Sequence, residues 1–433
     1  MKVEIISNKI NNDSKIDIAG YKHSFILDVC AALACNIHIK IDNVPEIQEK
    51  KVFCKIFDLL SKKYRSSKNQ LTLYPSKILN VDVPNVLSMQ VHGTIYLLPI
   101  LLQLRKSIKI FESGGCRIGN SNNKSTRPLQ HILDVMKKFG AFQQGDKMFL
   151  TEYQGTVIDV LPYSTNSKEL CGPLVSGVTK TAILCSLSAT SSTTIIHPYL
   201  KTDVLELLQL IHKMGYKITK TQNSIIIEKG KSNVDYISHR VSSDVTEVIT
   251  FVSFAVYYNV RLTLNCWDLE FLKLALKPEF ELLDEMGVFL EFSETSLTVF
   301  QNDRLKAMDI LVTGERIYSD SQPFFALMLL KANGISKITD NVWDNRMEYA
   351  KELKKAGLNF CINGNTLIIR PSATVSNLPV ELEAKDLRGA AVLILYALQC
   401  CGSIVSGCEH LKRGYESFWE KLRILGIEVK IIE

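Results

Sequence analysis

The hydrophobic positions of the chain follow one short pattern that returns at a nearly constant interval. Each copy has an apolar stripe with helical spacing, then a hydrophobic residue and a glycine, then two short runs of alternating apolar and polar residues. The five clear copies centre on Gly140, Gly215, Gly287, Gly357 and Gly426, which are 75, 72, 70 and 69 residues apart. A weaker copy, IFDLLSKKYRSSKNQLTLYP, precedes them by roughly one period. Six copies of about 70 residues therefore fill the chain.

Each copy predicts a mixed α/β module. The glycine fits a left-handed helix C-cap, and the polar turn that follows predicts a β-hairpin. Because such modules are too small to be independent domains, we expect two lobes with buried helices, such as residues 389–397, and a ligand cleft between the lobes. The expected lobes are residues 22–237 and residues 1–21 plus 238–433. A solenoid of six stacked units is the alternative that the periodicity leaves open.

The composition indicates a globular protein outside the membrane. Of 433 residues, 46% are hydrophobic and 22% are charged, which is an ordinary globular balance. The N-terminus lacks the apolar core of a secretory signal, and the longest apolar stretches, 94–104 and 389–405, are too short and too interrupted to span a membrane. We therefore expect a soluble cytoplasmic protein with no membrane partner.

Cysteine spacing and charge exclude several functional classes. The 11 cysteines form no CxxC pair and no cysteine–histidine pattern with the spacing of a zinc site, so we expect reduced thiols, no metal site and no cofactor. The net charge of +6 is modest for this length, and the lysine pairs lie near the ends of amphipathic segments. Nucleic-acid binding is therefore not expected. The oligomeric state stays open, with a monomer favoured.

Several short motifs occur in a fixed order along the repeats. They are GGCRIG at 114–119, RP at 127–128, YSDSQ at 318–322, WDNR at 343–346, KDLR at 385–388 and KRGYE at 412–416. In this order the motifs resemble those of the enolpyruvyl (carboxyvinyl) transferases, closest to the UDP-N-acetylglucosamine 1-carboxyvinyltransferase branch of peptidoglycan synthesis. The resemblance implies an α/β (α+β) fold, a two-lobed inside-out α/β barrel that closes over phosphoenolpyruvate and an acceptor alcohol.

The resemblance implies roles for two residues in proton transfer. Carboxyvinyl transfer needs a proton for the methylene carbon of phosphoenolpyruvate and a base for the acceptor hydroxyl. Cys116, on a loop rich in Gly, Asn and Ser, matches the family's loop cysteine and would act as the general acid. The alternative is that Cys116 takes no part in the reaction. Asp320 matches the family's base, although an aspartate there could also cap the helix that follows.

The other matching positions would bind the two substrates. Five cations would hold the phosphate and carboxylate groups of phosphoenolpyruvate: Lys22, Arg127, Arg346, Arg388 and Arg413. Lys22 and Arg413 are also expected to be catalytic. Acceptor contacts would come from His23, Arg127, Pro128, Leu129, Ser176, Gly177, Thr179 and Asp320. Asp386 and Leu387 would contact the substrates, although Asp386 could merely cap a helix, and Gly414 would let the backbone approach the cleft or shape a turn.

Departures from the family pattern concentrate on the acceptor side. Seven residues, NSNNKST, separate Gly119 from Arg127 where the family has one. His23 replaces the usual Asn, Gln130 replaces an Asp, and the segments MQVHGT at 89–94 and VSGVTKT at 175–181 differ from the family's sequences. Phosphoenolpyruvate handling is thus expected to be retained while acceptor recognition is altered.

Three functional hypotheses follow. The first is transfer of the enolpyruvyl group to UDP-N-acetylglucosamine with release of phosphate by addition–elimination. The second is the same reaction on a nucleoside monophosphate or another phosphorylated alcohol in specialised metabolism. The third is a non-catalytic relative that binds a nucleotide or a partner. The surviving Cys116, Asp320 and arginines argue against the third hypothesis.

Overall fold

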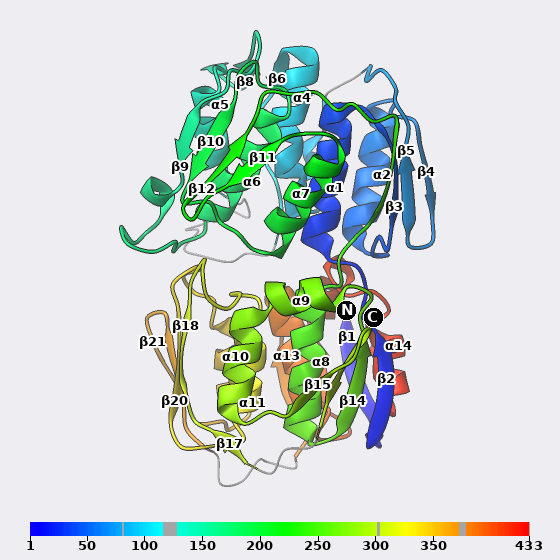
Figure 1. The fold of residues 1–433 in the computed structure, drawn as a ribbon. Coiled ribbons are helices and arrows are strands. Elements are labelled where there is room, and N and C mark those ends of the chain that lie inside the picture. Colours follow the sequence, from blue (N-terminus) through cyan, green and yellow to red (C-terminus); the bar gives the residue numbers. More distant parts are fainter. Residues whose placement is uncertain (80–81, 116–127, 301–303, 372–377, 433) are drawn as a thin grey trace. The chain divides into compact units, whose positions relative to one another are not determined.

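The chain divides into two compact units. The computed structural model describes residues 1–79, 82–115, 128–300, 304–371 and 378–432. Within these, unit 1 contains residues 1–19 and those from 243 onward, and unit 2 contains residues 20–115 and those up to 242. The chain passes from one unit to the other at 19–20 and at 242–243 (Figure 1). Each unit contains three of the six sequence repeats.

Unit 2 contains one sheet for each of the first three repeats. In spatial order the strands are β13(Tyr236–Arg240)–β3(His38–Asp42)–β5(Gln70–Leu73)–β4(Tyr64–Ser67), β6(Ser107–Lys109)–β8(Lys147–Phe149)–β7(Phe142–Gln144) and β11(Ile218–Lys220)–β12(Ser224–Ile227)–β10(Thr193–Ile196)–β9(Val157–Asp159). In the two four-stranded sheets an outer strand runs parallel to its neighbour, which then pairs antiparallel with a hairpin.

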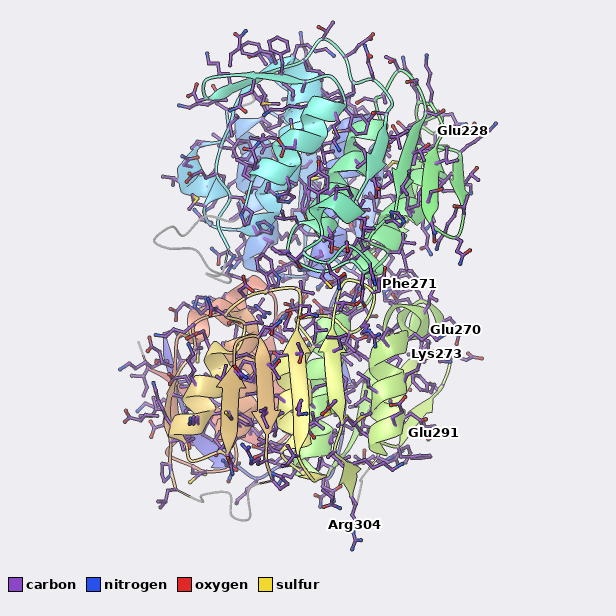
Figure 2. The ribbon with its side chains drawn as sticks, turned by 90° about the vertical axis from the view of Figure 1, so that its left-hand side faces the viewer. Glu228, Glu270, Phe271, Lys273, Glu291 and Arg304 are labelled. Atoms are coloured by element: carbon purple, nitrogen blue, oxygen red, sulfur yellow. The ribbon has the colours of Figure 1, made fainter. Side chains whose placement is uncertain are left out.

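Unit 1 repeats this plan in two of its sheets, and in the third sheet two strands distant in sequence take the place of the hairpin. Its sheets are β15(Leu290–Phe292)–β16(Ser296–Val299)–β14(Arg261–Asn265)–β2(Asp13–Asp17), β18(Asp309–Val312)–β20(Ser336–Asp340)–β22(Thr366–Ile369)–β21(Phe360–Asn363) and β23(Glu381–Glu383)–β24(Ile404–Ser406)–β1(Lys2–Asn8)–β25(Ile427–Ile432). A two-stranded ladder joins β17(Leu305–Lys306) to β19(Ala332–Asn333). Figure 2 shows the sheet of β18, β20, β22 and β21, in yellow and orange, on the outside of this unit.

The repeat glycines adopt the left-handed conformation that their position predicts. Their φ angles are +97° at Gly140 and Gly215, +87° at Gly287 and Gly426, and +89° at Gly357. This is the conformation that ends a helix at low cost only for a residue without Cβ. In the weaker first copy a serine, Ser61, takes the same place with φ +56°. The predicted six-fold repeat of helix, cap and strand is therefore confirmed.

The last copy differs from the predicted hairpin. The pattern after Gly426 predicts two strands, but this segment forms the single strand β25. The partner of β25 is the N-terminal strand β1, which pairs with it antiparallel from Lys2 opposite Ile432 to Asn8 opposite Ile427. A strand distant in sequence thus takes the place of the second strand of the hairpin and completes the sheet.

Each unit has three buried helices at its centre. They are α1(Lys22–Cys35), α4(Leu97–Arg105) and α6(Val175–Ser186) in unit 2 and α8(Val245–Tyr258), α11(Gln322–Leu329) and α13(Leu387–Ala397) in unit 1. Within each unit the three helices contact one another, and most of their residues are buried. The helix of the first copy thus touches that of the third, which a solenoid of stacked units does not allow. The solenoid alternative is wrong.

A second set of helices is amphipathic and packs between these helices and solvent. It comprises α2(Gln48–Leu59), α5(Gln130–Lys138), α7(Thr202–Lys213), α10(Lys277–Met286), α12(Glu348–Lys355) and α14(Phe418–Ile424). Shorter helical segments are α3(Asn85–Ser88), α9(Leu269–Ala275), η1(His92–Tyr96), η2(Leu161–Tyr163) and η3(Cys408–Arg413). The longest helices, α1 and α8, have 14 residues, and within the described ranges none combines the length and apolar character needed to cross a bilayer.

Candidate active site

The site in unit 1 forms where its buried helices begin. The first turn of a helix presents unpaired N–H groups and a partial positive charge, so this end favours anions. At the start of α13, Asp386 Oδ1 accepts hydrogen bonds from the backbone N–H groups of Arg388 and Gly389, at 3.0 Å each. Asp386 is therefore the helix cap that its position allowed. Asp320, by contrast, does not cap α11, whose N-cap is Ser321.

Four charged side chains meet there, and we call them the arginine–carboxylate cluster: Asp320, Arg346, Asp386 and Arg388. Arg346 Nη2 donates to Asp320 Oδ1 at 2.6 Å, and Arg388 Nε donates to Asp320 Oδ2 at 3.0 Å. Arg346 Nη1 also lies 3.8 Å from Asp386 Oδ1. The arginines are 3% and 1% exposed, whereas the Asp320 side chain is 33% exposed. Asp320 is thus the member of the cluster that solvent reaches.

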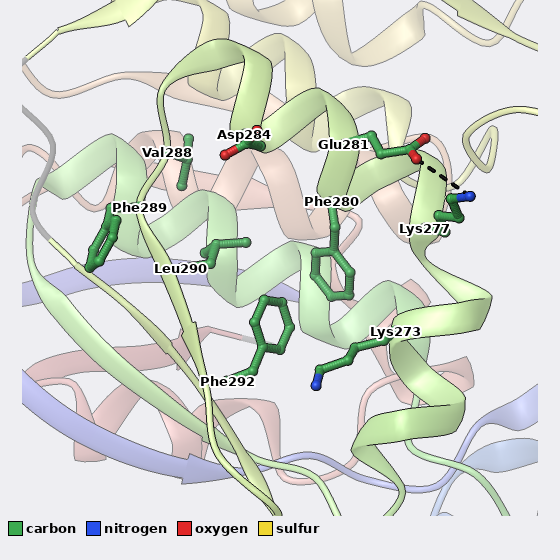
Figure 3. Close-up of a pocket in the computed structure, with 9 residues that line it drawn as sticks. All are labelled: Lys273, Lys277, Phe280, Glu281, Asp284, Val288, Phe289, Leu290 and Phe292. Atoms are coloured by element: carbon green, nitrogen blue, oxygen red, sulfur yellow. Dashed lines mark ion pairs between the residues drawn. The ribbon is translucent and has the colours of Figure 1, made fainter.

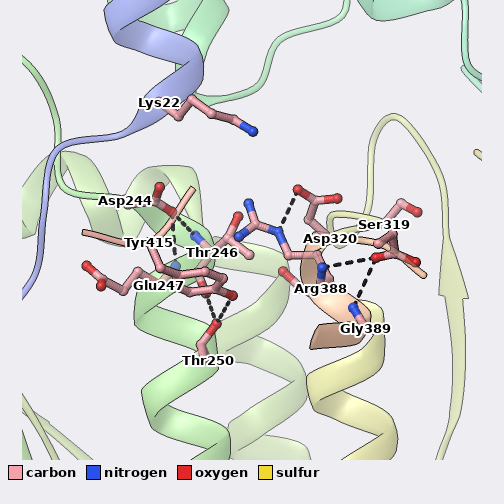
Figure 4. A network of polar contacts seen from close by, with 12 residues as sticks. Lys22, Asp244, Thr246, Glu247, Thr250, Ser319, Asp320, Arg388, Gly389 and Tyr415 are labelled. Carbon is pink, nitrogen blue, oxygen red and sulfur yellow. Dashed lines mark hydrogen bonds and ion pairs between the residues drawn. The ribbon is translucent and has the colours of Figure 1, made fainter. Parts of the chain in front are cut away.

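Arg388 is held in an environment that keeps it charged. Burial would lower its pKa, but the Asp320 carboxylate outweighs burial and the pKa is raised. Its guanidinium lies 5.2 Å from the ring centre of Tyr415, whose hydroxyl is 2.7 Å from Thr250 Oγ1 (Figure 4). Arg388 Nη1 is buried and has no hydrogen-bond partner among the described residues. Because a buried donor without a partner costs free energy, this N–H is suited to an anionic oxygen.

The loop that carries Asp320 is fixed by buried carboxylates. Glu279 Oε1 accepts from the backbone N–H of Tyr318 at 2.7 Å and from Ser321 Oγ at 3.1 Å. Ser319 Oγ donates to Asp340 Oδ2 at 2.6 Å. These contacts bracket the aspartate on both sides, so its backbone is anchored while its side chain stays accessible.

The remaining predicted residues of unit 1 lie around α13. Leu387, the first residue of the helix, is buried. A Cβ on Gly414 would come within 2.6 Å of Leu387 Cδ2, so the glycine leaves room for this side chain. Arg413 is half-buried at the end of η3, two residues before the tyrosine that stacks on Arg388.

In unit 2, two predicted residues begin α1. Lys22 is its first residue, and its Nζ lies 3.7 Å from Glu49 Oε1. The Lys22 side chain is 12% exposed and that of Glu49 is 2% exposed. His23 is half-buried, and its ring meets that of Tyr21 edge-on at 5.3 Å. Lys22 is thus a nearly buried cation at the positive end of a buried helix, as an anion-binding lysine would be.

The segment 175–181 contains three predicted acceptor contacts, and two of them are buried inside unit 2. Thr179 is fully buried; its hydroxyl donates to Val175 O at 3.1 Å and accepts from the backbone N–H of Tyr199 at 3.0 Å. A Cβ on Gly177 would lie 2.2 Å from His131 Nε2, so this glycine permits α5 and α6 to pack closely. Both residues have structural roles, and the half-buried Ser176 is the more accessible of the three.

Some predicted site residues are exposed or lie outside the described residues, and two residues that were not predicted join the site. Pro128 is exposed, and Leu129 is half-buried at the start of α5. Cys116 and Arg127 lie outside the described residues. Sequence reasoning missed Tyr415 and Glu279. Tyr415 could have been suspected because it follows Gly414 in a quoted motif, whereas nothing in the sequence marks Glu279.

A cavity of about 430 Å³ lies elsewhere in unit 1, between α9, α10 and β15 (Figure 3). Its wall is largely apolar, and Lys273 lies 5.1 Å from the ring centre of Phe292. The nine lining residues are Lys273, Lys277, Phe280, Glu281, Asp284, Val288, Phe289, Leu290 and Phe292. None of the predicted site residues lines this cavity, so it is not the predicted site.

Comparison with known proteins identifies relatives along nearly the whole chain. Residues 9–422 match the family described as EPSP synthase (3-phosphoshikimate 1-carboxyvinyltransferase). A UDP-N-acetylglucosamine 1-carboxyvinyltransferase of Coprothermobacter proteolyticus is 29% identical, over 100% of this chain and 98% of the relative. The UDP-N-acetylglucosamine 1-carboxyvinyltransferase 2 of Prochlorococcus marinus is 27% identical, over 96% and 94%.

Two solved structures share the fold. The enolpyruvyl transferase NikO from Streptomyces tendae superposes with a TM-score of 0.91 at 28% identity, covering 99% of this chain and 98% of NikO. EPSP synthase from Acinetobacter baumannii has a TM-score of 0.72 at 16% identity, covering 99% and 100%. The expected fold class, built from two sets of three repeats, is thereby confirmed.

Proposed function

Because this chain belongs to the EPSP synthase family of carboxyvinyl transferases, we propose that it transfers the enolpyruvyl group of phosphoenolpyruvate to a hydroxyl of UDP-N-acetylglucosamine. The observation that carries the proposal is the partly exposed Asp320 carboxylate held between the buried guanidinium groups of Arg346 and Arg388. This arrangement combines two anion-binding groups with a proton acceptor.

The reaction divides into an addition and an elimination. The acceptor oxygen bonds to C2 of phosphoenolpyruvate while C3 takes up a proton, which gives a tetrahedral adduct with a methyl group. The methyl group then loses a proton as the C2–O bond to phosphate breaks. The double bond is restored, and the products are the enolpyruvyl ether and phosphate.

Asp320 is the proposed base for the acceptor hydroxyl. With both arginines donating to it, the carboxylate is stabilised as an anion and is a weak base. Phosphoenolpyruvate brings a phosphate and a carboxylate, both of which compete for the same guanidinium groups. When the arginines turn to the substrate, the positive charge that they place beside the Asp320 carboxylate is partly withdrawn, and the affinity of the carboxylate for a proton rises. Substrate binding would thus activate the base.

The other proposed roles follow the family positions. Cys116 would protonate C3 or assist phosphate release, and Lys22, Arg127, Arg346, Arg388 and Arg413 would bind phosphoenolpyruvate. Because Arg388 Nη1 is buried without a partner among the described residues, an oxygen of the substrate would satisfy it. We further propose that residues 22–237 and residues 1–21 with 238–433 act as the two lobes that enclose the substrates.

UDP-N-acetylglucosamine is the first candidate acceptor because relatives with that activity in their names cover nearly the whole chain. His23, Arg127, Pro128, Leu129, Ser176 and Asp320 would contact it. A cytoplasmic role in peptidoglycan synthesis would follow from this acceptor.

A second acceptor class, a nucleoside monophosphate or another phosphorylated alcohol, is favoured by two specific observations. Gly177 and Thr179, two of the expected acceptor contacts, are engaged in internal packing. NikO, an enolpyruvyl transferase named differently from the UDP-N-acetylglucosamine enzymes, is as similar to this chain as they are. The chemistry at Asp320 would be the same for either acceptor.

An acceptor panel tests the proposal. Purified protein is incubated with phosphoenolpyruvate and, separately, UDP-N-acetylglucosamine, UMP, UDP and 3-phosphoshikimate, and phosphate release is followed with the product mass. We expect UDP-N-acetylglucosamine to give the highest kcat/KM. A higher value for UMP would assign the second acceptor class, and release that no acceptor stimulates would reject transfer altogether.

A further inference from the structure

A buried cluster in unit 2 has no part in the proposed reaction. It consists of Asp28 on α1, Glu206 on α7 and His239 on β13, and we call it the Asp–Glu–His cluster. The side chains are 0%, 3% and 4% exposed. One potential ligand atom from each residue lies within 4.8 Å of the other two. Three elements distant in sequence therefore bring two carboxylates and an imidazole together in the core.

The two carboxylates converge on the same nitrogen. His239 Nε2 is 3.1 Å from Asp28 Oδ2 and 3.1 Å from Glu206 Oε1. A ring nitrogen carries one hydrogen, so it can make one well-directed hydrogen bond and not two. A histidine that links two carboxylates by hydrogen bonds would normally use its two nitrogens, one for each. Ligands that share one cation converge in the same way.

The outer atoms of the cluster are unsatisfied. Asp28 Oδ1, Glu206 Oε2 and His239 Nδ1 are buried and have no hydrogen-bond partner among the described residues. Two buried carboxylates against one imidazole leave an excess of negative charge. Lys213, on the exposed side of α7, contributes a further positive charge that acts on Asp28. Buried charge of this kind is normally neutralised by a counter-ion or a proton.

The ligand types and spacing suit a transition metal. Zn²⁺ binds imidazole nitrogen and carboxylate oxygen at roughly 2.0–2.2 Å, so its ligand atoms lie roughly 3.0–3.5 Å apart. The two N···O distances of 3.1 Å fall in this range. An imidazole also favours first-row transition metals over Mg²⁺ and Ca²⁺, which prefer oxygen ligands.

We propose that Asp28, Glu206 and His239 bind one divalent transition-metal ion, with Zn²⁺ as the best-fitting probe, and that this ion is structural. The ligands are nearly inaccessible to solvent, so substrate would not reach the ion. Its effect would be to join α1, α7 and β13. Glu206 Oε1 also accepts from the backbone N–H of Ser242 at 2.9 Å, so the ion would stiffen the end of β13 where the chain leaves unit 2.

The competing occupant is a proton. Burial raises the pKa of Asp28 to about 6. Burial would lower the pKa of His239, but the carboxylates of Asp28 and Glu206 outweigh it and raise that pKa to about 10. The cluster thus attracts positive charge of either kind, and only a metal analysis distinguishes the two.

The experiment measures metal content and metal response. Untagged protein is purified without chelator and its metal is determined by mass spectrometry for the wild type, Asp28→Asn and His239→Gln. The matched control is Asp203→Asn, which removes an equally buried carboxylate of α7 that pairs with Lys180. We expect about one Zn²⁺ per chain in the wild type and the control. We expect Zn²⁺ affinity to fall more than about 100-fold in both cluster variants.

A second measurement does not depend on the folding of variants. Wild-type protein is stripped with a chelator and titrated with Co²⁺, whose visible absorption reports low-symmetry nitrogen and oxygen ligation. The proposal predicts saturation at one equivalent and a rise in Tm with Zn²⁺. Wild-type protein that binds no Co²⁺ or Zn²⁺, or metal that Asp28→Asn retains in full, would overturn it in favour of a protonated His239.

Discussion

At the scale of single residues, the proposed transfer depends on the balance of charge at Asp320. The Asp320→Asn variant keeps the shape of the side chain but cannot accept a proton. We expect kcat to fall by roughly 10²–10⁴-fold, the usual contribution of a general base. Phosphoenolpyruvate binding should persist or tighten, because Arg346 and Arg388 lose an anionic partner. Steady-state kinetics together with a binding titration separate the two effects.

The matched control for this variant is Asp309→Asn, which removes an exposed carboxylate of unit 1 that pairs with Lys337 at 3.6 Å. Its kinetics should stay near those of the wild type. Turnover by Asp320→Asn at the control's level would remove Asp320 as the base. Equal loss of binding and turnover would instead assign it a purely positioning role.

A second prediction at this scale concerns thiol reactivity. Burial raises the pKa of Cys408 to about 12, and it raises the pKa values of Cys30, Cys185 and Cys266 still further, so these thiols are poor nucleophiles. A phosphonate epoxide, which resembles phosphoenolpyruvate in its anion, should therefore label Cys116 first. A neutral alkylating agent should instead label the exposed Cys361 and Cys401 as well.

Peptide mass spectrometry after a time course identifies the labelled residue. Cys116→Ser should escape the epoxide and lose most turnover, while Cys361→Ser serves as the control and should retain both properties. Epoxide labelling that begins at Cys361 or Cys401 would show that anion recognition does not guide the reagent to Cys116.

The residue types of the site were accessible from the sequence, whereas their partners were not. Ordered motifs indicated Asp320, Arg346 and Arg388, and the structure brings these three together. The role of Glu279 was hidden because its partners are a backbone N–H and a hydroxyl more than 35 residues away, which no spacing rule reveals. Thr179 matched a motif position, but its hydroxyl is turned to backbone groups of its own unit.

At the scale of elements, the repeat glycines give a test of the helix caps. Gly357 has φ +89°, and a Cβ there would meet nothing within 4 Å, so Gly357→Ala changes only backbone strain. We expect a loss of about 1–2 kcal/mol in the free energy of unfolding. Ser61 occupies the equivalent place with φ +56°, so Ser61→Gly should stabilise the protein by up to about 1 kcal/mol.

Denaturant unfolding shows whether the free energy of unfolding falls in Gly357→Ala and rises in Ser61→Gly. Gly357→Asn is the control, because asparagine tolerates the left-handed region better than alanine and should cost less. A destabilised Ser61→Gly together with a neutral Gly357→Ala would show that these positions do not share one cap conformation.

The packing of α5 against α6 predicts a pH dependence of stability. Burial lowers the pKa of His131 to about 4, from a value near 6.5 in the unfolded chain. The unfolded state therefore binds more protons between these values, and the folded state is fully stable only above about pH 6.5. Stability should fall by about 3 kcal/mol in total as the pH drops to about 4.

Unfolding curves measured across this pH range test the prediction. His131→Gln should remove most of this slope, whereas His212→Gln, at an exposed position on α7, should leave it unchanged. An unaltered slope in His131→Gln would assign the acid sensitivity to other groups.

At the scale of the whole molecule, periodicity predicted the module but not how modules close on one another. Glycine spacing and alternation were sufficient for the helix, cap and hairpin because these depend on nearby residues. The contact of α1 with α6, and of α8 with α13, depends on which apolar faces meet across more than 100 residues. The pairing of β1 with β25 is of the same kind, since the two strands lie at opposite ends of the chain.

The most direct test of enolpyruvyl transfer is the mass of the product formed in D₂O. An addition–elimination passes through a methyl group, so deuterium from solvent should enter the vinyl methylene of the enolpyruvyl ether, with one phosphate released for each ether formed. Asp320→Asn should form neither at a comparable rate. Phosphate release with pyruvate and no ether, or an ether without deuterium in its methylene group, would contradict the account.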